Sequence, residues 1–427
     1  MNKRPAVSVS LFFKTSALYF TACFFLISGF MLYAGFFNAA QAQSFSEKPY
    51  ELRFAPDLWY NDVDGIRVGI RMRGQVPGTF DDGPHRLDSG LWLGTWLPSS
   101  PVSYYVKYTN PIPSISGFNS EGSYSLLSSI RTGFHRHGAG FDKRWQPGFN
   151  EDEFTQLAVF GGVYRHFDSE YLVFPALWQD EWTPYLSLTA ERQQLTHAGF
   201  LYYRAAAVSG LTGGKEFFTG LQAEVRKSVE LGSRLNLRLR ATGGVLAGDS
   251  PPEQRYIASQ AAAFHWMNSG FFRAKGTIPV PWLESGAFQL TGNGPNLRGY
   301  ARRDAKQAGN GTPFFYDAYT AFNAEIDYPN PIDLLFERIP ILGDFLRLRS
   351  YLFTDVFSGS VYDSDSTENL ADAGAGFALS LNIPDQLGRP RGFILRFDAP
   401  VWLSEPDEDD SAFKLRGVVS FGAVIGF

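Results

Sequence analysis

The chain has 427 residues, of which 19% are charged and 16% aromatic, and it contains 43 glycines and 39 phenylalanines. This composition favours short strands and turns, and a single apolar run of spanning length, at the N-terminus, excludes a protein built of several membrane helices. The formal net charge of −5 argues against nucleic acid as a partner.

The N-terminal segment has the organisation of an export signal. Cations within the first 14 residues precede a long apolar stretch that ends in Ala40-Gln41-Ala42, the small-x-small pattern that a signal peptidase recognises. We therefore predict a signal peptide over residues 1–42 and a mature chain that starts near Gln43. An uncleaved membrane anchor is the alternative interpretation.

Cleavage would remove Cys23, the only cysteine of the chain. We therefore expect neither a disulfide nor a cysteine metal site in the mature protein. Cleavage would also remove three cations and no acids, so that 35 basic groups face 43 acidic groups and the net charge becomes −8.

From about Tyr50 onward the chain alternates between apolar and polar residues. The segments SRLNLRLRATGG (233–244), GIRVGIRMRG (65–74) and GLQAEVRKSV (220–229) each place aliphatic side chains on one face and charged or polar ones on the other. Consecutive segments of this kind, each long enough to cross a bilayer, predict a transmembrane antiparallel β-barrel, because only a closed ring satisfies every backbone group in lipid.

We predict about sixteen strands, since bacterial barrels contain an even number. No linker divides the mature chain, so residues 43–427 are interpreted as one outer-membrane β-barrel. Besides the three segments above, the predicted strands span residues 86–97, 101–110, 123–134, 155–165, 184–194, 199–209, 256–266, 271–278, 285–291, 315–328, 346–356, 373–383, 391–403 and 413–427.

The last strand ends in an aromatic residue. In KLRGVVSFGAVIGF (414–427) a lipid-facing row finishes on Phe427, which resembles the C-terminal signature by which bacterial outer-membrane barrels are recognised for assembly. The outer-membrane assembly machinery is accordingly an expected partner, and the bacterial outer membrane is the expected location. The residues of this assembly signal are Phe421, Ala423, Ile425 and Phe427.

The stretch GNGPNLRGYARRD (292–304) places arginines in a segment of glycine, asparagine and proline. Strand parity directs Glu325 and Asp355 of two later strands into the barrel. A loop that folds back into the interior would bring Arg298 to these two acids, and glycines would permit the sharp return. The alternative is that the arginines of this stretch are solvated loop cations.

Five segments together resemble the C-terminal barrel of the bacterial surface antigen superfamily, the outer-membrane assembly and translocation barrels. They are LRGY, NAEIDYP, LFTDVFSG, AGAGFALSL and the terminal strand ending in phenylalanine. The resemblance implies sixteen strands and a sixth extracellular loop whose tip, here Arg298, Gly299 and Tyr300, contacts inward acids, here Glu325 and Asp355. The sequence departs from the family at Phe357, where a glycine is usual.

The resemblance also implies a mode of action in protein assembly or polypeptide translocation. DLWYNDVDGIRVG is similar to the first strand of superfamily members that are fused to peptidase domains. A weak seam between the first strand (59–74) and the last (413–427) would open toward lipid. Too few residues precede the first strand for a periplasmic polypeptide-transport-associated domain, so a separate periplasmic docking protein or hydrolase is an expected partner.

Enzyme signatures are poor. The chain has no His-Glu-x-x-His and no Gly-x-Ser-x-Gly motif, and strand parity suggests no outward Ser-His pair of the kind a barrel phospholipase needs. His135 and His137 are interpreted as an exposed loop pair rather than a metal site. We therefore expect no enzymatic activity, no cofactor and no metal. The alternative functions are a passive pore or structural barrel and the membrane half of a separately encoded peptidase or lipase system.

Overall fold

The structure is a computed structural model. It describes residues 50–61, 65–75, 86–96, 102–131, 133–148, 150, 152–166, 172, 174–211, 217–232, 235–269, 280–332, 346–384, 390–408 and 410–424. The predicted signal peptide over residues 1–42 lies outside these ranges.

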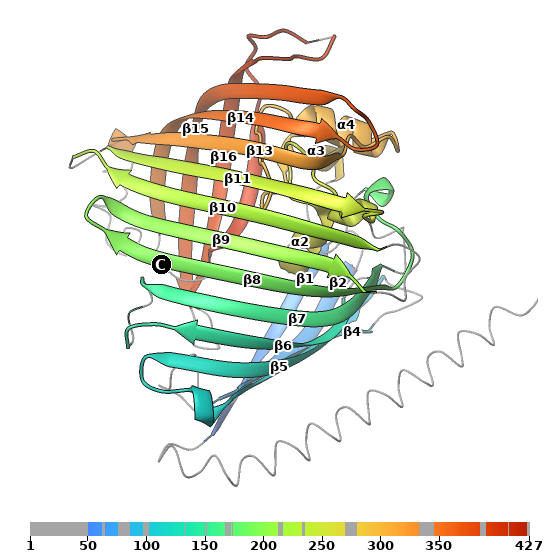
Figure 1. The fold of residues 1–427 in the computed structure, drawn as a ribbon, viewed down its shortest axis with the longest axis vertical. Helices are drawn as coiled ribbons and strands as arrows, with labels where there is room; N and C mark the ends of the chain where they lie inside the picture. Colours follow the sequence, from blue (N-terminus) through green and yellow to red (C-terminus); the bar gives the residue numbers. More distant parts are fainter. Residues whose placement is uncertain are drawn as a thin grey trace, which may run out of the picture.

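The described part of the chain forms one large, strongly curved β-sheet (Figure 1). Each strand from β1 to β11 pairs antiparallel with the next, β11 pairs with β13, and the succession continues to β17. The strands are β1 (Glu51–Asn61), β2 (Gly65–Gln75), β3 (Arg86–Gly94), β4 (Val102–Pro111), β5 (Ser120–Arg131), β6 (Phe134–Trp145), β7 (Phe154–His166), β8 (Thr183–Thr196), β9 (Gly199–Gly210), β10 (Phe218–Glu230), β11 (Asn236–Gly248), β12 (Phe288–Gln289), β13 (Tyr316–Tyr328), β14 (Leu346–Val361), β15 (Thr367–Pro384), β16 (Pro390–Leu403) and β17 (Val418–Val424).

The sheet has 17 strands among the described residues, of which all but the two-residue β12 belong to the antiparallel succession. This agrees with the predicted number, although individual predictions were wrong. The predicted first strand, 59–74, is a hairpin of β1 and β2, and Gly65 at the start of β2 has a φ of 66°, which favours glycine. The strand β6 was missed because histidines interrupt its apolar face.

The predicted strands in the connection between β11 and β13 were also wrong. Residues 256–266 form irregular backbone and the start of α2, and they are buried on nearly every side rather than on alternate sides. Of the predicted strand 285–291, only Phe288–Gln289 is a strand. The predicted strand 271–278 lies outside the described residues.

The two faces of the sheet differ as the alternation predicts. On β2, Ile66, Val68 and Ile70 are about half exposed, while Arg71 and Arg73 of the same strand point to the other side and approach Asp57 and Asp88. We call the face with the exposed aliphatic residues the outward face and the opposite, concave one the inner face. A large apolar surface of this kind is unusual for a protein in water and typical of one that contacts lipid.

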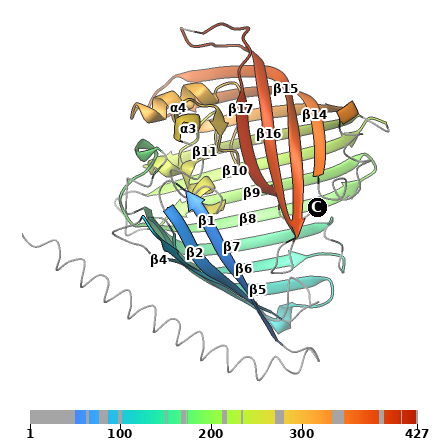
Figure 2. The same cartoon turned by 180° about the vertical axis from the view of Figure 1, so that it is seen from behind.

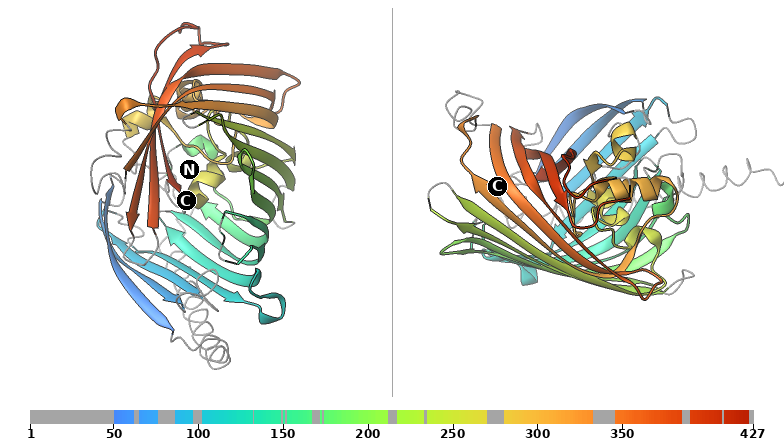
Figure 3. Two further views of the ribbon diagram at one scale, coloured as in Figure 1. Left: turned by 90° about the vertical axis from the view of Figure 1, so that its left-hand side faces the viewer. Right: turned by 90° about the horizontal axis from the view of Figure 1, so that it is seen from above.

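Helical segments lie within the curve of the sheet (Figure 3). They pack against one another through a cluster of buried residues that includes Leu177, Trp266, Leu283 and Ala305. Phe264 of α2 packs on the inner face of the sheet against Tyr164 and Tyr185. None of the described helices is long and apolar enough to cross a membrane. These segments are η4 (Pro175–Leu177), η5 (Pro252–Gln254), α2 (Ala263–Ser269), α3 (Val280–Glu284) and α4 (Ala301–Gly309), whereas η2 (Pro113–Ile115) lies in the connection between β4 and β5.

The sheet is not closed within the described residues, where β1 and β17 have no pairing with each other. Both edges lie on the same side of the molecule (Figure 2). Residues 280–315, which we call the inner segment, occupy part of the β17 edge, because β12 pairs with β17 in parallel and Val419 N donates to Ala287 O at 2.7 Å. An internal strand therefore covers backbone groups of β17 that a neighbouring strand would otherwise use.

Candidate functional site

The backbone of residues 292–300 is held along the inner face of the sheet. Gln222 Nε2 on β10 donates to Asn293 O at 2.8 Å, and Arg240 Nη2 on β11 donates to Gly294 O at 2.7 Å. Asn323 Nδ2 on β13 donates to the next carbonyl, Pro295 O, at 3.2 Å. Three consecutive strands thus satisfy three consecutive carbonyl groups of an irregular segment, which fixes its path across the sheet.

Arg298 lies at the centre of a buried ion-pair network. Its side chain is about 6% exposed, and its guanidinium lies 2.6 Å from Glu325, 3.4 Å from Asp355 and 3.7 Å from Asp398. The guanidinium also lies over the ring of Phe353, 4.0 Å from the ring centroid. Burial disfavours the charged guanidinium, but Asp355 and Glu325 outweigh this effect and raise the pKa of Arg298.

Glu325 on β13 joins three arginines. Besides Arg298, it accepts hydrogen bonds from Arg349 Nη1 at 2.8 Å and from Arg396 Nη2 at 2.5 Å. Arg349 also pairs with Asp327 at 2.6 Å. Because several arginines share this carboxylate, the loss of one of them leaves Glu325 paired.

The backbone N–H groups of Arg298 and Gly299 each donate to a buried acid. The N–H of Gly299 donates to Asp372 Oδ2 at 2.8 Å, and the N–H of Arg298 donates to Asp355 Oδ2 at 3.4 Å. Asp355 and Asp372 are direct cross-strand partners and fully buried. A Cβ atom at Gly299 would lie 2.2 Å from Leu403 Cδ2 and 2.8 Å from Asp372 Cβ, so the close approach requires glycine.

Tyr300 and helix α4 also contact the sheet, near the ends of β15 and β16. The Tyr300 hydroxyl lies 3.2 Å from Ser404 Oγ and accepts a hydrogen bond from Glu405 N at 3.1 Å. Arg303 pairs with Glu368 at 2.7 Å, whereas Arg302 is exposed. The interpretation of all these arginines as solvated cations therefore fits Arg302 alone.

Sequence reasoning singled out Glu325 and Asp355, and the structure places both beside Arg298. It missed Asp372, Asp398, Arg349 and Arg396 as members of the network. The signal for Asp398 and Arg396 was present, since both lie on the inward parity of a correctly predicted strand. Asp372 escaped because the predicted strand began one residue after it, whereas β15 begins at Thr367.

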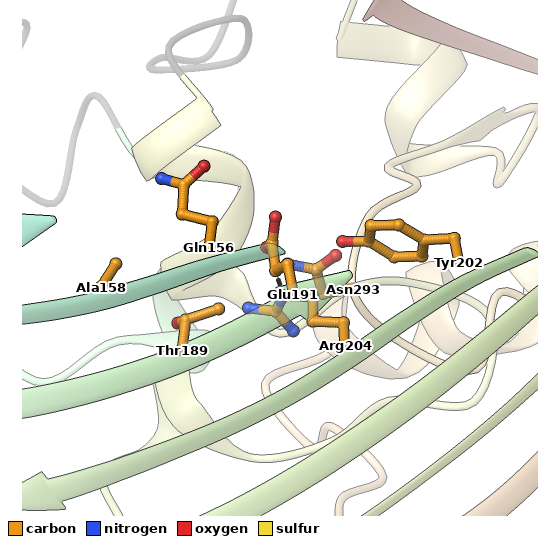
Figure 4. A pocket seen from close by; sticks show the side chains of 7 residues that line it. All are labelled: Gln156, Ala158, Thr189, Glu191, Tyr202, Arg204 and Asn293. Carbon is orange, nitrogen blue, oxygen red and sulfur yellow. Dashed lines mark ion pairs between the residues drawn. The ribbon is translucent and has the colours of Figure 1, made fainter. Parts of the chain in front are cut away.

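A polar cavity of about 280 Å³ lies beside the loop on the inner face (Figure 4). Glu191 on β8 and Arg204 on β9 are cross-strand partners in its wall and form an ion pair at 3.3 Å. The remaining lining residues are Gln156, Ala158, Thr189, Tyr202 and Asn293. The polar lining shows that water can hydrate this part of the inner face.

The structure also describes the histidine pair and part of the predicted C-terminal assembly signal. Among the described residues, no group of His, Cys, Asp and Glu side chains is arranged to hold a metal. His135 and His137 lie in strand β6, so their interpretation as an exposed loop pair was wrong. Of the C-terminal assembly signal, Phe421 and Ala423 belong to β17, while Ile425 and Phe427 lie outside the described residues.

No protein-family model matches the chain, and no curated protein matches it. Among solved structures, the chain is similar to BamA from Haemophilus ducreyi lacking POTRA domains 1-3, with 12% identity, 88% of this chain and 71% of that chain covered, and a TM-score of 0.45. It is also similar to a bacterial polysaccharide outer membrane secretin, with 10% identity, 83% and 92% covered, and a TM-score of 0.36.

Proposed function

We propose that this protein is a bacterial outer-membrane β-barrel that acts in membrane-protein assembly or polypeptide translocation, with no enzymatic step in its interior. The observation that supports this most is the pair of sheet edges, β1 and β17, that are not joined to each other within the described residues. Backbone groups at such edges can pair with a strand of another chain. The exposed aliphatic side chains of the outward face support a place for these edges in lipid.

The lengths of the connections between strands support one orientation of the protein in the outer membrane. The longest connection, residues 249–315 between β11 and β13, joins the strands at one end of the sheet, and β17 runs toward the opposite end. Barrels of this class have short periplasmic turns and longer extracellular loops. In the proposal, the inner segment therefore enters from the extracellular side and the C-terminus faces the periplasm, where a separate docking protein or hydrolase would deliver the substrate.

In the proposal, the inner segment controls whether the seam between β1 and β17 is closed or open. Arg298, Gly299 and Tyr300 would fix the segment to β13, β14 and β15, and Glu325 and Asp355 would serve as the anchoring acids. The same segment contains β12, which pairs with β17. Opening of the seam to a substrate strand would then require β12 to leave the β17 edge.

A disulfide between β12 and β17 tests this proposal. Phe288 and Val419 are Cα partners in the parallel pairing, so Phe288→Cys/Val419→Cys in a Cys23→Ser background would lock the segment on the edge. Val68 and Leu93 are partners on β2 and β3, a pairing that involves neither the β1 edge nor the β17 edge, and Val68→Cys/Leu93→Cys provides a matched control.

The assay measures the folding of a urea-denatured outer-membrane barrel polypeptide into vesicles that contain the reconstituted protein. We expect the oxidised β12–β17 variant to lose the activity, to recover it on reduction, and to insert into vesicles as the control does. Full activity of the oxidised variant would contradict a role for the seam. Absence of activity in the unmodified protein would favour the passive pore.

A further inference from the structure

A chain of hydrogen-bonded polar side chains crosses three neighbouring strands. The Tyr104 hydroxyl on β4 lies 2.9 Å from Ser128 Oγ on β5, and Ser128 Oγ lies 3.0 Å from His137 Nδ1 on β6. Ser128 and His137 are direct cross-strand partners, which keeps their side chains adjacent on one face. A serine hydroxyl within hydrogen-bond distance of an imidazole nitrogen is the arrangement that activates serine as a nucleophile.

These side chains belong to the outward face. Val102 and Phe141, which share their parity on β4 and β6, are 48% and 39% exposed. The next residue after Ser128, Ser129, is buried on the inner side, where its partner Arg136 donates to Tyr185. On a face that contacts lipid, polar and ionisable side chains are costly and mark functional sites.

The position of Ser128 and His137 along their strands matches the depth of the ester groups of membrane lipids. Ser128 lies three residues before the end of β5, about 10 Å along the strand. Trp182, which is 38% exposed, has its ring centroid 5.4 Å from His135 and 6.1 Å from His137. Exposed aromatic residues of barrels gather at the headgroup level of the bilayer, and that is the depth at which acyl chains are esterified to membrane lipids.

We propose that Ser128 and His137 form a catalytic pair that cleaves acyl esters of membrane lipids from the outward face of the protein. This proposal rests on the outward face being in lipid, as the proposed function has it, but not on the seam. It departs from the expectation of no enzymatic activity. The sequence did not reveal this pair, because β6, which carries His137, was not predicted as a strand.

The reaction has two steps. Ser128 Oγ attacks the ester carbonyl carbon while its proton passes to His137 Nδ1, and the Tyr104 hydroxyl donates to the carbonyl oxygen as negative charge develops there. The bond to the lipid alkoxide breaks, and the alkoxide takes the proton from His137. Water then attacks the acyl-serine, again with His137 as the base, and releases the fatty acid and the free serine.

A fluorophosphonate probe tests the pair in the folded full-length protein in detergent micelles. We expect labelling at Ser128, mapped by mass spectrometry of the digested protein. Ser129→Ala, a substitution of the neighbouring inward serine, should retain the label, and Ser128→Ala should lose it. His137→Asn should slow labelling by about 100-fold, since a general base contributes roughly that much or more. Each variant is checked for folding by its heat-dependent migration on a gel.

A second readout identifies the substrate. Vesicles of phospholipid and lipopolysaccharide that contain the protein should release fatty acid, and Ser128→Ala should abolish the release while Ser129→Ala preserves it. No labelling of Ser128, or labelling that His137→Asn leaves unchanged, would overturn the catalytic pair. Labelling without release of fatty acid from these vesicles would overturn the lipid ester as substrate. Neither outcome affects the seam experiment, whose readout is the folding of a polypeptide.

Discussion

Removal of the Arg298 guanidinium should destabilise the inner segment strongly. In Arg298→Met, Glu325 keeps Arg349 and Arg396 as partners, so the cost falls mainly on Asp355, which is fully buried and retains a hydrogen bond from Asn323. Breaking a buried ion pair costs about 3–5 kcal/mol. Because one of the two closest acids stays paired, we expect about 3 kcal/mol, the lower end of that range.

The assay is urea unfolding of the protein in micelles, followed by tryptophan fluorescence, together with protease cleavage of the inner segment. Arg302→Met is the matched control, since Arg302 lies four residues along the same segment and is exposed. It should change the free energy of unfolding by no more than about 0.5 kcal/mol. Equal effects of the two substitutions would refute the role of Arg298 as a buried anchor.

Three further outcomes are expected. Gly299→Ala should weaken the protease resistance of the inner segment, because its Cβ would meet Leu403 and Asp372, whereas Gly309→Ala, where no atom lies within 4 Å, should not. Burial raises the pKa of Glu253 from 4.5 to about 7. The protonated carboxyl therefore contributes its full stability below about pH 4.5, and this contribution is lost as the pH rises through about 7. Glu253→Gln should lack this part of the pH dependence in urea unfolding. Deletion of residues 292–300 should raise the conductance of the protein in planar bilayers, and an unchanged conductance would argue that the segment does not restrict the interior.

The strand pattern was largely predictable, because alternation of apolar and charged residues is a local property. On β2, β10, β11, β13 and β14 the sequence alone separated the two faces correctly. It failed at β6, where His135 and His137 stand at outward positions and break the apolar row. One of these two histidines, His137, is also a member of the proposed catalytic pair.

The inner segment could be predicted only in part. The glycine-rich stretch and the inward acids made the meeting of Arg298 with Glu325 and Asp355 predictable from parity. The contacts of Asp372 and Asp398 depend on how far the strands extend and how they are registered, which is set by pairing between distant residues. The pairing of β12 with β17 joins segments about 130 residues apart, and no local signal reports it.

The assignment of the outward face to lipid is tested most directly by spin labels along β10. Single cysteines at Leu221, Gln222, Ala223, Glu224 and Val225 in a Cys23→Ser background would carry the labels in protein reconstituted into vesicles. The labels at Leu221, Ala223 and Val225 should be relaxed by oxygen, which dissolves in lipid, and shielded from a water-soluble nickel complex, while the other two should not be relaxed by lipid-dissolved oxygen. Nickel access to the labels at Leu221, Ala223 and Val225 equal to that at Gln222 and Glu224 would contradict a lipid-facing exterior.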